Sequence, residues 1–205
     1  MMMGFQFVAF EGIDGCGKAT QVDELSRAIR KKRQPFVVHK YPTKHAQSVH
    51  DHLNGVKKLA PDALFAAFVD DLVAGQPLLA QDRKKAWVLC DRYVISTAAY
   101  QGVDGRLDER VAQLSSRPWI KPDIVIWLDL PVEEAMRRKA AQKKPDVHEA
   151  DRVFLESVRA NFDSLYRMKF LCSNWKRIDA SQKPEKIAAE IRAAVENGPL
   201  SSIGV

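Results

Sequence analysis

Short apolar runs alternate with amphipathic segments along the whole chain. Unbroken apolar runs predict buried strands at residues 5–10, 36–39, 86–90, 124–128 and 176–179. Between and after them, apolar positions at helical spacing predict helices at residues 18–33, 61–75, 107–117, 150–170 and 184–195, and one further helix that carries residues 137–139. Strands that alternate with helices predict an α/β fold, in which a five-stranded parallel sheet has helices on both faces.

Length and composition indicate one domain that spans residues 1–205, because 46% hydrophobic residues can build a substantial core. No apolar stretch approaches a membrane span, and the first residues lack the pattern of a signal peptide, so we expect a cytoplasmic protein. The three cysteines form no C-x-x-C pair, which favours free thiols. The net charge of +6 suits either nucleic acid or a pocket for phosphorylated small molecules, and charge alone does not choose between them.

Two groups of polar residues resemble metal ligands but have the wrong spacing. His45, His50 and His52 do not stack on one helix face, so we interpret them as solvated histidines. Asp70 and Asp71 are adjacent on a predicted helix and diverge by about 100°, so a solvated or capping role is expected for at least one. Neither group predicts a metal site.

The first strand runs into a glycine-rich loop and then a helix. Gly12, Gly15 and Gly17 allow the backbone to curl with its N–H groups inward, and the helix that begins near Lys18 adds its positive end. The spacing is that of the Walker A motif, whose lysine reaches the β- and γ-phosphates of a nucleoside triphosphate. The residues expected at ATP are Gly12, Ile13, Asp14, Gly15, Cys16, Gly17, Lys18, Ala19 and Thr20.

Two residues of this loop have special consequences. Ala19 stands where the motif normally has a hydroxyl that ligates Mg²⁺, and the nearest hydroxyl, on Thr20, comes one residue late. Cys16 lies near the positive end of the helix, which predicts a lowered thiol pKa and reaction with thiol reagents.

The predicted strand at residues 86–90 is followed directly by Asp91 and Arg92. A carboxylate in this position is typical of the Walker B residue of P-loop enzymes, so Asp91 is the predicted metal ligand. Arg92 would be costly to bury alone, and it either makes a structural ion pair or grips a phosphate.

The segment 91–101 resembles the Asp-Arg-Tyr-x-x-Ser-x-x-Ala-Tyr-Gln signature of thymidylate kinases. Residues 11–21 resemble the P-loop of that family, residues 41–44 its Phe-Pro-x-Arg segment and residues 178–181 its adenine-side loop. The resemblance runs from about Phe5 to Val195 with the motifs in the family's order. It implies a P-loop NTPase fold, a mobile LID at about residues 137–150 and a homodimer.

The resemblance also implies an activity, in which the γ-phosphoryl group of ATP passes to dTMP with Mg²⁺. Lys18, Asp91, Arg92 and Arg137 would act in catalysis, with Lys143 and Lys144 as further LID cations, and Ala180 would lie at the adenine. The residues implied for dTMP are Asp14 at the 3′-hydroxyl, Lys44 and Arg92 at the phosphate, Phe65 stacked on thymine, Tyr100 against the 2′ position, and Ser96 and Gln101.

Three positions depart from the family pattern. Val69 replaces an arginine that donates to thymine, Lys44 replaces an arginine, and Gly15 stands where some members carry a catalytic arginine. The alternatives to this function are a related kinase with another acceptor, a P-loop protein that binds nucleotide without turnover, and a nucleic-acid-binding module. The last is disfavoured because the basic residues are scattered and no platform of aromatic and basic residues appears.

Overall fold

Five parallel strands form the centre of the computed structural model, which describes residues 6–140 and 152–196. The strands are β1 (Phe7–Glu11), β2 (Phe36–Lys40), β3 (Trp87–Asp91), β4 (Ile124–Asp129) and β5 (Trp175–Asp179). Their order in the sheet is β2-β3-β1-β4-β5, so β1 lies in the middle and pairs with both β3 and β4. The predicted five-stranded sheet is confirmed, with strand ends shifted by one or two residues.

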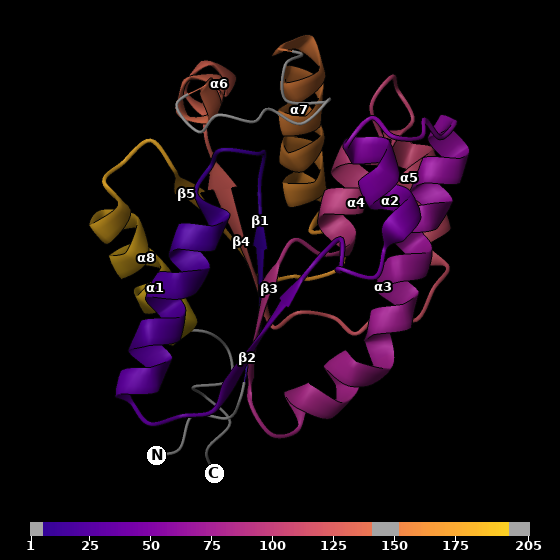
Figure 1. The fold of residues 1–205 in the computed structure, drawn as a ribbon. Helices are drawn as coiled ribbons and strands as arrows, with labels where there is room; N and C mark the ends of the chain where they lie inside the picture. The colour runs from indigo at the N-terminus through magenta and orange to yellow at the C-terminus, as the bar shows by residue number, and fades with distance from the viewer. Residues whose placement is uncertain (1–5, 141–151, 197–205) are drawn as a thin grey trace.

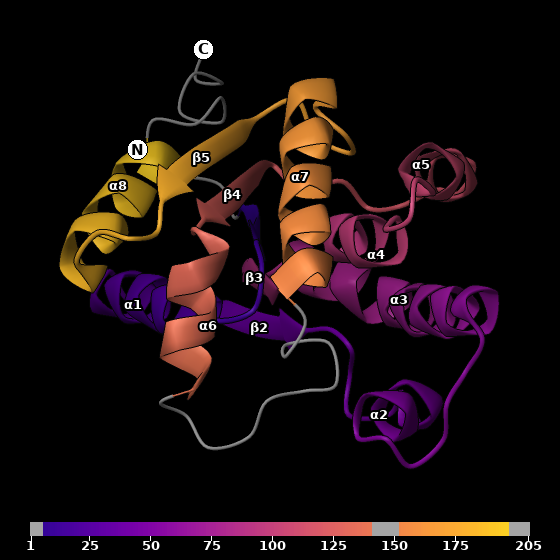
Figure 2. The same ribbon diagram turned by 90° about the horizontal axis from the view of Figure 1, so that it is seen from above.

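Helices cover both faces of this sheet (Figures 1 and 2). They are α1 (Lys18–Lys31), α2 (Gln47–Leu53), α3 (Pro61–Arg83), α4 (Val94–Gln101), α5 (Leu107–Ser115), α6 (Val132–Ala140), α7 (Arg152–Met168) and α8 (Pro184–Glu196). The helices α1 and α8 pack together on one face, whereas α3, α4 and α7 lie on the other. The strands β1, β3 and β4 are buried along their whole length, as their apolar sequences require.

The helix predicted to end near Gly75 continues through Pro77 to Arg83, so that prediction is wrong. Proline lacks the N–H that would bind a carbonyl one turn earlier. The side-chain amide of Gln76 donates to the Leu72 carbonyl at 3.0 Å, which satisfies a backbone acceptor beside this gap. Figure 1 shows that α3 bends along its length, and bending lets the helix tolerate its proline.

The short helix α2 was not predicted, and it corrects the interpretation of His52 as solvated. His52 lies on α2 and is buried, and its Nδ1 accepts a hydrogen bond from the Leu59 backbone at 2.9 Å. His45 is exposed. No group of three or more metal-binding side chains occurs among the described residues. The contact of His52 with the Leu59 backbone gives that side chain a structural role.

The loop after β2 is held from two helices. Asp71 on α3 accepts a hydrogen bond from the Thr43 backbone N–H at 2.8 Å, and Asp70 beside it is exposed. His50 on α2 contacts the Thr43 carbonyl through its Nε2 at 2.8 Å. The solvated role expected for at least one of the two aspartates is confirmed for Asp70, and the contacts of Asp71 and His50 with Thr43 set the path of residues 41–44.

Candidate active site

A cavity of about 570 Å³ opens at the carboxyl edge of the sheet. The chain runs from β1 to β2 and β3 on one side and to β4 and β5 on the other, so the strand order reverses at β1. Ligands bind α/β sheets at such a reversal. The sequence-predicted residues that line the cavity are Asp14, Gly15, Gly17, Lys18, Ala19, Thr20, Asp91, Arg92, Ser96, Tyr100 and Gln101.

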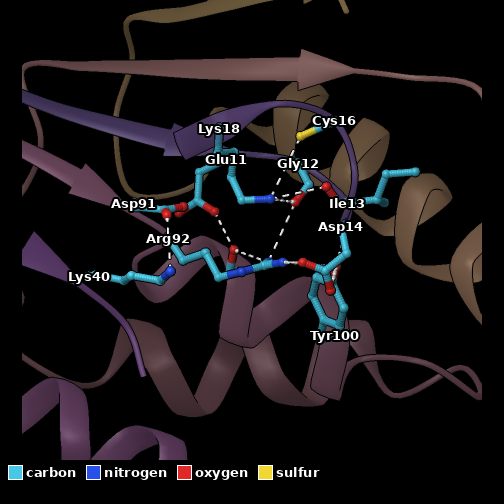
Figure 3. A network of polar contacts seen from close by, with 11 residues as sticks. Glu11, Gly12, Ile13, Asp14, Cys16, Lys18, Lys40, Asp91, Arg92 and Tyr100 are labelled. Carbon is cyan, nitrogen blue, oxygen red and sulfur yellow. Dashed lines mark hydrogen bonds and ion pairs between the residues drawn. The ribbon is translucent and has the colours of Figure 1, made fainter. Parts of the chain in front are cut away.

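The glycine-rich loop follows β1 directly and has the curled backbone that the sequence predicts. Gly12 and Gly15 both have positive φ. A Cβ atom added to Gly12 would lie 2.5 Å from the Leu128 carbonyl oxygen, and one added to Gly15 would lie 2.8 Å from the Ala135 carbonyl oxygen. Only glycine fits these positions. The buried Lys18 Nζ donates to the carbonyls of Gly12 and Ile13, each at 3.0 Å (Figure 3).

Asp91 and Arg92 reach the cavity from the end of β3. Asp91 is buried and its Oδ2 lies 3.8 Å from Lys40 Nζ. Arg92 has φ of +68°, a left-handed conformation that costs about 1–2 kcal/mol for a residue with a side chain. Its side chain donates to Asp14 and to Ser96 Oγ, the latter at 3.2 Å, so the strained backbone aims the guanidinium at the glycine-rich loop (Figure 3).

Tyr100 completes a contact network with Asp14 and Arg92. Its hydroxyl donates to Asp14 Oδ2 at 3.1 Å and accepts the Asp14 backbone N–H at 3.0 Å, while the Arg92 guanidinium lies 4.8 Å from its ring centre. Burial alone would raise the Asp14 pKa, but the positive charges of Arg92, Lys18 and Lys139 together more than offset it and lower that pKa below its ordinary value. Asp14 is therefore an ionised, oriented acceptor at neutral pH.

Glu11 is a residue that sequence reasoning missed as part of the site. Its side chain is fully buried, accepts the Tyr93 backbone N–H at 2.9 Å and accepts a hydrogen bond from Ser96 Oγ. Burial raises its pKa from 4.5 to about 7, although Ser96 and Arg92 oppose the rise. The signal in the sequence was a charged residue that ends an otherwise apolar strand.

The structure corrects the placement of two residues predicted to bind the acceptor. Phe65 is buried, and its ring faces the Arg110 guanidinium at 4.2 Å instead of the cavity. Phe68, one helical turn later, lines the cavity. Lys44 is exposed and lies off the cavity wall, whereas Lys40 is part of that wall.

Arg137 also lies off the cavity wall. It is exposed and its Nε donates to Glu134 at 2.7 Å. Lys139, two residues later on α6, lines the cavity. Ala180 is buried, and its carbonyl accepts a hydrogen bond from Arg138 at 3.1 Å. Most of the predicted LID, including Lys143 and Lys144, lies outside the described residues.

The prediction of a lowered pKa for the Cys16 thiol is wrong. The side chain is buried beneath the glycine-rich loop, with its sulfur 3.7 Å from Lys18 Nζ. Burial raises the pKa of this thiol, and the nearby positive charges of Lys18 and Arg92 do not reverse the effect. Loss of hydration therefore outweighs the nearby positive charges.

A second cavity, of about 580 Å³, lies beside α6 and α7. Arginines and carboxylates both line it, and they pair with one another. Arg159 and Arg177 hold Asp129 at 2.7 and 2.6 Å, and Arg152 contacts Glu133 at 2.8 Å. These ion pairs give the charged side chains at this cavity a structural role, because they join neighbouring elements of the fold.

Comparison with known proteins agrees with this geometry. The sequence profile of the thymidylate kinase family matches residues 10–191. A thymidylate kinase of Bradyrhizobium diazoefficiens is 35% identical, over 94% of this chain and 89% of its own length. A thymidylate kinase of Prochlorococcus marinus is 32% identical, across 93% of this chain and 96% of its own length. A thymidylate kinase of Akkermansia muciniphila is 33% identical, across 93% of this chain and 91% of its own length. The likeness extends across nearly the whole of each relative.

Proposed function

The chain belongs to the thymidylate kinase family of phosphotransferases, and we propose that its cavity binds ATP and dTMP and uses Mg²⁺ to form dTDP and ADP. The observation that carries this proposal is the meeting of Lys18, Asp91 and Arg92 at one cavity, within the matched family region. Phosphoryl transfer needs little covalent chemistry from the protein, which instead positions two nucleotides and neutralises charge.

The glycine-rich loop and Lys18 are proposed to bind the ATP phosphates, because inward N–H groups and an ammonium form an anion site. Arg92 is proposed to hold the acceptor phosphate, and Asp14 the 3′-hydroxyl of the sugar. The contact of Arg92 with Asp14 supports these neighbouring roles, since phosphate and sugar of one nucleotide must be held side by side. Tyr100 packs over Arg92 and gives the sugar pocket an aromatic wall.

The side chains present fit a magnesium ion held chiefly by nucleotide phosphates. Magnesium is often bound through one or two carboxylates together with substrate phosphates and water. Asp91 supplies one buried carboxylate on the cavity wall, beside Ala19 and Thr20. Asp91 would hold the ion directly or through water, and the ion would neutralise charge on the transferring phosphoryl group.

The experiment that tests the function is an acceptor panel with ATP and Mg²⁺, comparing dTMP, dUMP, dCMP, AMP and thymidine. We expect kcat/KM to be highest for dTMP. A clear preference for another acceptor favours a related kinase. Val69 makes this a specific alternative, because it replaces the family's arginine that donates to thymine. Absence of ATP consumption with every acceptor favours a nucleotide-binding protein without turnover.

We also propose a homodimer that uses the exposed side of α3. By length and composition this helix could cross a membrane, so the prediction that no apolar stretch approaches a membrane span is wrong for it. Its buried side packs in the protein core. On its other side, Val73 and Leu78 are 42% and 54% exposed. Sedimentation of wild type and Leu78→Glu tests the proposal, with a shift to monomer expected for the variant. An unchanged sedimentation coefficient would place the subunit contact elsewhere.

A cytoplasmic location is proposed on the state of the thiols. Cys16, Cys90 and Cys172 are all buried and unpaired with one another. Free cysteines are typical of reducing compartments, where nucleotide substrates also occur. Fractionation of cells that produce the protein tests this location.

A further inference from the structure

We infer that Lys40 is a second cation for the acceptor phosphate, beside Arg92. This inference rests on the proposed function, since it names a further binding residue of the same site. Lys40 is the last residue of β2 and is paired in register with Asp91 at the end of β3. Both side chains line the cavity, together with Arg92 and Lys18.

The acceptor end of the cavity needs positive charge beyond Arg92. A phosphate monoester carries a charge of about −1.5 to −2 at neutral pH. The Arg92 guanidinium is engaged by the Asp14 carboxylate and by Ser96 Oγ, so its single charge is already partly neutralised. Lys18 is directed to the glycine-rich loop by two carbonyl contacts. A further cation on the β2 side would complete the binding of a doubly charged group.

Lys40 can supply that charge at small cost. Its ammonium lies 3.8 Å from Asp91 Oδ2, which exceeds hydrogen-bond distance, and its side chain is 70% exposed. An exposed lysine keeps most of its hydration and its flexible stem, so its ammonium can turn from Asp91 to a phosphate oxygen. Figure 3 shows Lys40 approaching Asp91 from the side opposite to the glycine-rich loop.

Lys44, the residue assigned to this role by family resemblance, is poorly placed for it. The loop between Lys40 and Lys44 is fixed at Thr43, whose backbone N–H donates to Asp71 and whose carbonyl oxygen lies 2.8 Å from His50 Nε2. Lys44 follows this anchored turn and is exposed off the cavity wall. The two lysines therefore make a matched comparison, with equal charge and a separation of four residues.

The test measures the dissociation constants of dTMP and thymidine by calorimetry for wild type, Lys40→Met, Lys40→Arg and Lys44→Met. Methionine keeps an unbranched stem and removes the charge. Thymidine lacks the phosphate, so its binding reports the base and sugar pockets alone. Lys84→Met is the control for net charge, because Lys84 precedes β3 at the opposite edge of the sheet.

We expect Lys40→Met to weaken dTMP binding by about tenfold or more, the usual effect of losing a charge-assisted hydrogen bond, with thymidine binding unchanged. Lys40→Arg should restore most of the loss, and Lys44→Met and Lys84→Met should bind dTMP like wild type. Equal weakening of dTMP and thymidine by Lys40→Met would overturn the inference, as would a larger effect of Lys44→Met. If wild type itself binds dTMP no better than thymidine, the proposed function fails, and the inference fails with it.

Discussion

Replacing Glu11 with glutamine should change how the stability of the protein depends on pH. In the folded protein burial raises the Glu11 pKa to about 7, from an ordinary value of 4.5. An acid with a raised folded pKa holds its proton in the folded state while the unfolded chain has released it. The free energy of unfolding therefore falls as pH rises from about 4.5 to about 7, and is flat above that range.

The size of the effect follows from the two pKa values. They differ by about 2.5, and each unit corresponds to about 1.4 kcal/mol, so ionisation of Glu11 costs the folded state about 3 kcal/mol at pH 8. Glutamine has nearly the same shape as protonated glutamate and can still accept the Tyr93 N–H. Glu11→Gln should thus unfold with a free energy about 3 kcal/mol above wild type at pH 8, and close to wild type at pH 4.5.

Urea denaturation of both proteins at pH 4.5, 6 and 8 measures this difference. The control is Glu24→Gln, a partly exposed glutamate on α1. The control should follow wild type at every pH. If Glu11→Gln and wild type keep the same difference in unfolding free energy from pH 4.5 to pH 8, Glu11 does not titrate in this range and our account of its burial is wrong.

Four further results are expected. Phe68→Ala should raise the KM for the acceptor by about tenfold, because this ring lines the cavity. Phe65→Ala should mainly lower the free energy of unfolding, by about 3–5 kcal/mol, because this ring is buried. Kinetics and denaturation separate the two effects. Cys16 should react slowly with iodoacetamide at pH 7.5, because burial raises its pKa, and fast labelling that ATP prevents would contradict this. Tyr100→Ala should lower the ratio of dTMP to ribothymidine monophosphate turnover, and Tyr100→Phe, which keeps the ring, should not. Ala19→Ser should lower the Mg²⁺ concentration for half-maximal rate, and an unchanged Mg²⁺ titration would show that the position needs no hydroxyl.

Local patterns determined the order of the elements and the glycine-rich loop. Five apolar runs predicted five strands, and the central strands β1, β3 and β4 are buried along their whole length because a strand covered on both faces requires apolar side chains at successive positions. The prediction of burial is wrong for the edge strands β2 and β5, which are only partly buried. Gly12 and Gly15 were identifiable from their spacing in the loop. The structure supplies the reason, because their backbone conformations and close contacts admit no side chain. The end of α3 was not identifiable, since the helix continues past Pro77 with a bend and buries Leu79 in the core, which local sequence does not specify.

The position of each side chain around the cavity was decided by tertiary structure. Phe65 and Phe68 lie on the same predicted apolar stripe, and only the packing of Arg110 against Phe65 determined which ring faces the core. Lys40 and Lys44 carry the same charge, and the sequence alone does not show which of them lines the cavity. The anchored loop between them leaves Lys40 on the cavity wall and Lys44 off it.

The sequence by itself determined that a glycine-rich loop, a carboxylate and an arginine follow buried strands, since those properties depend on residues a few positions apart. Tertiary structure decided the protonation of Glu11 and Cys16. A pKa depends on how much water the surrounding elements exclude and on which charges they bring near, and those elements come from distant parts of the chain.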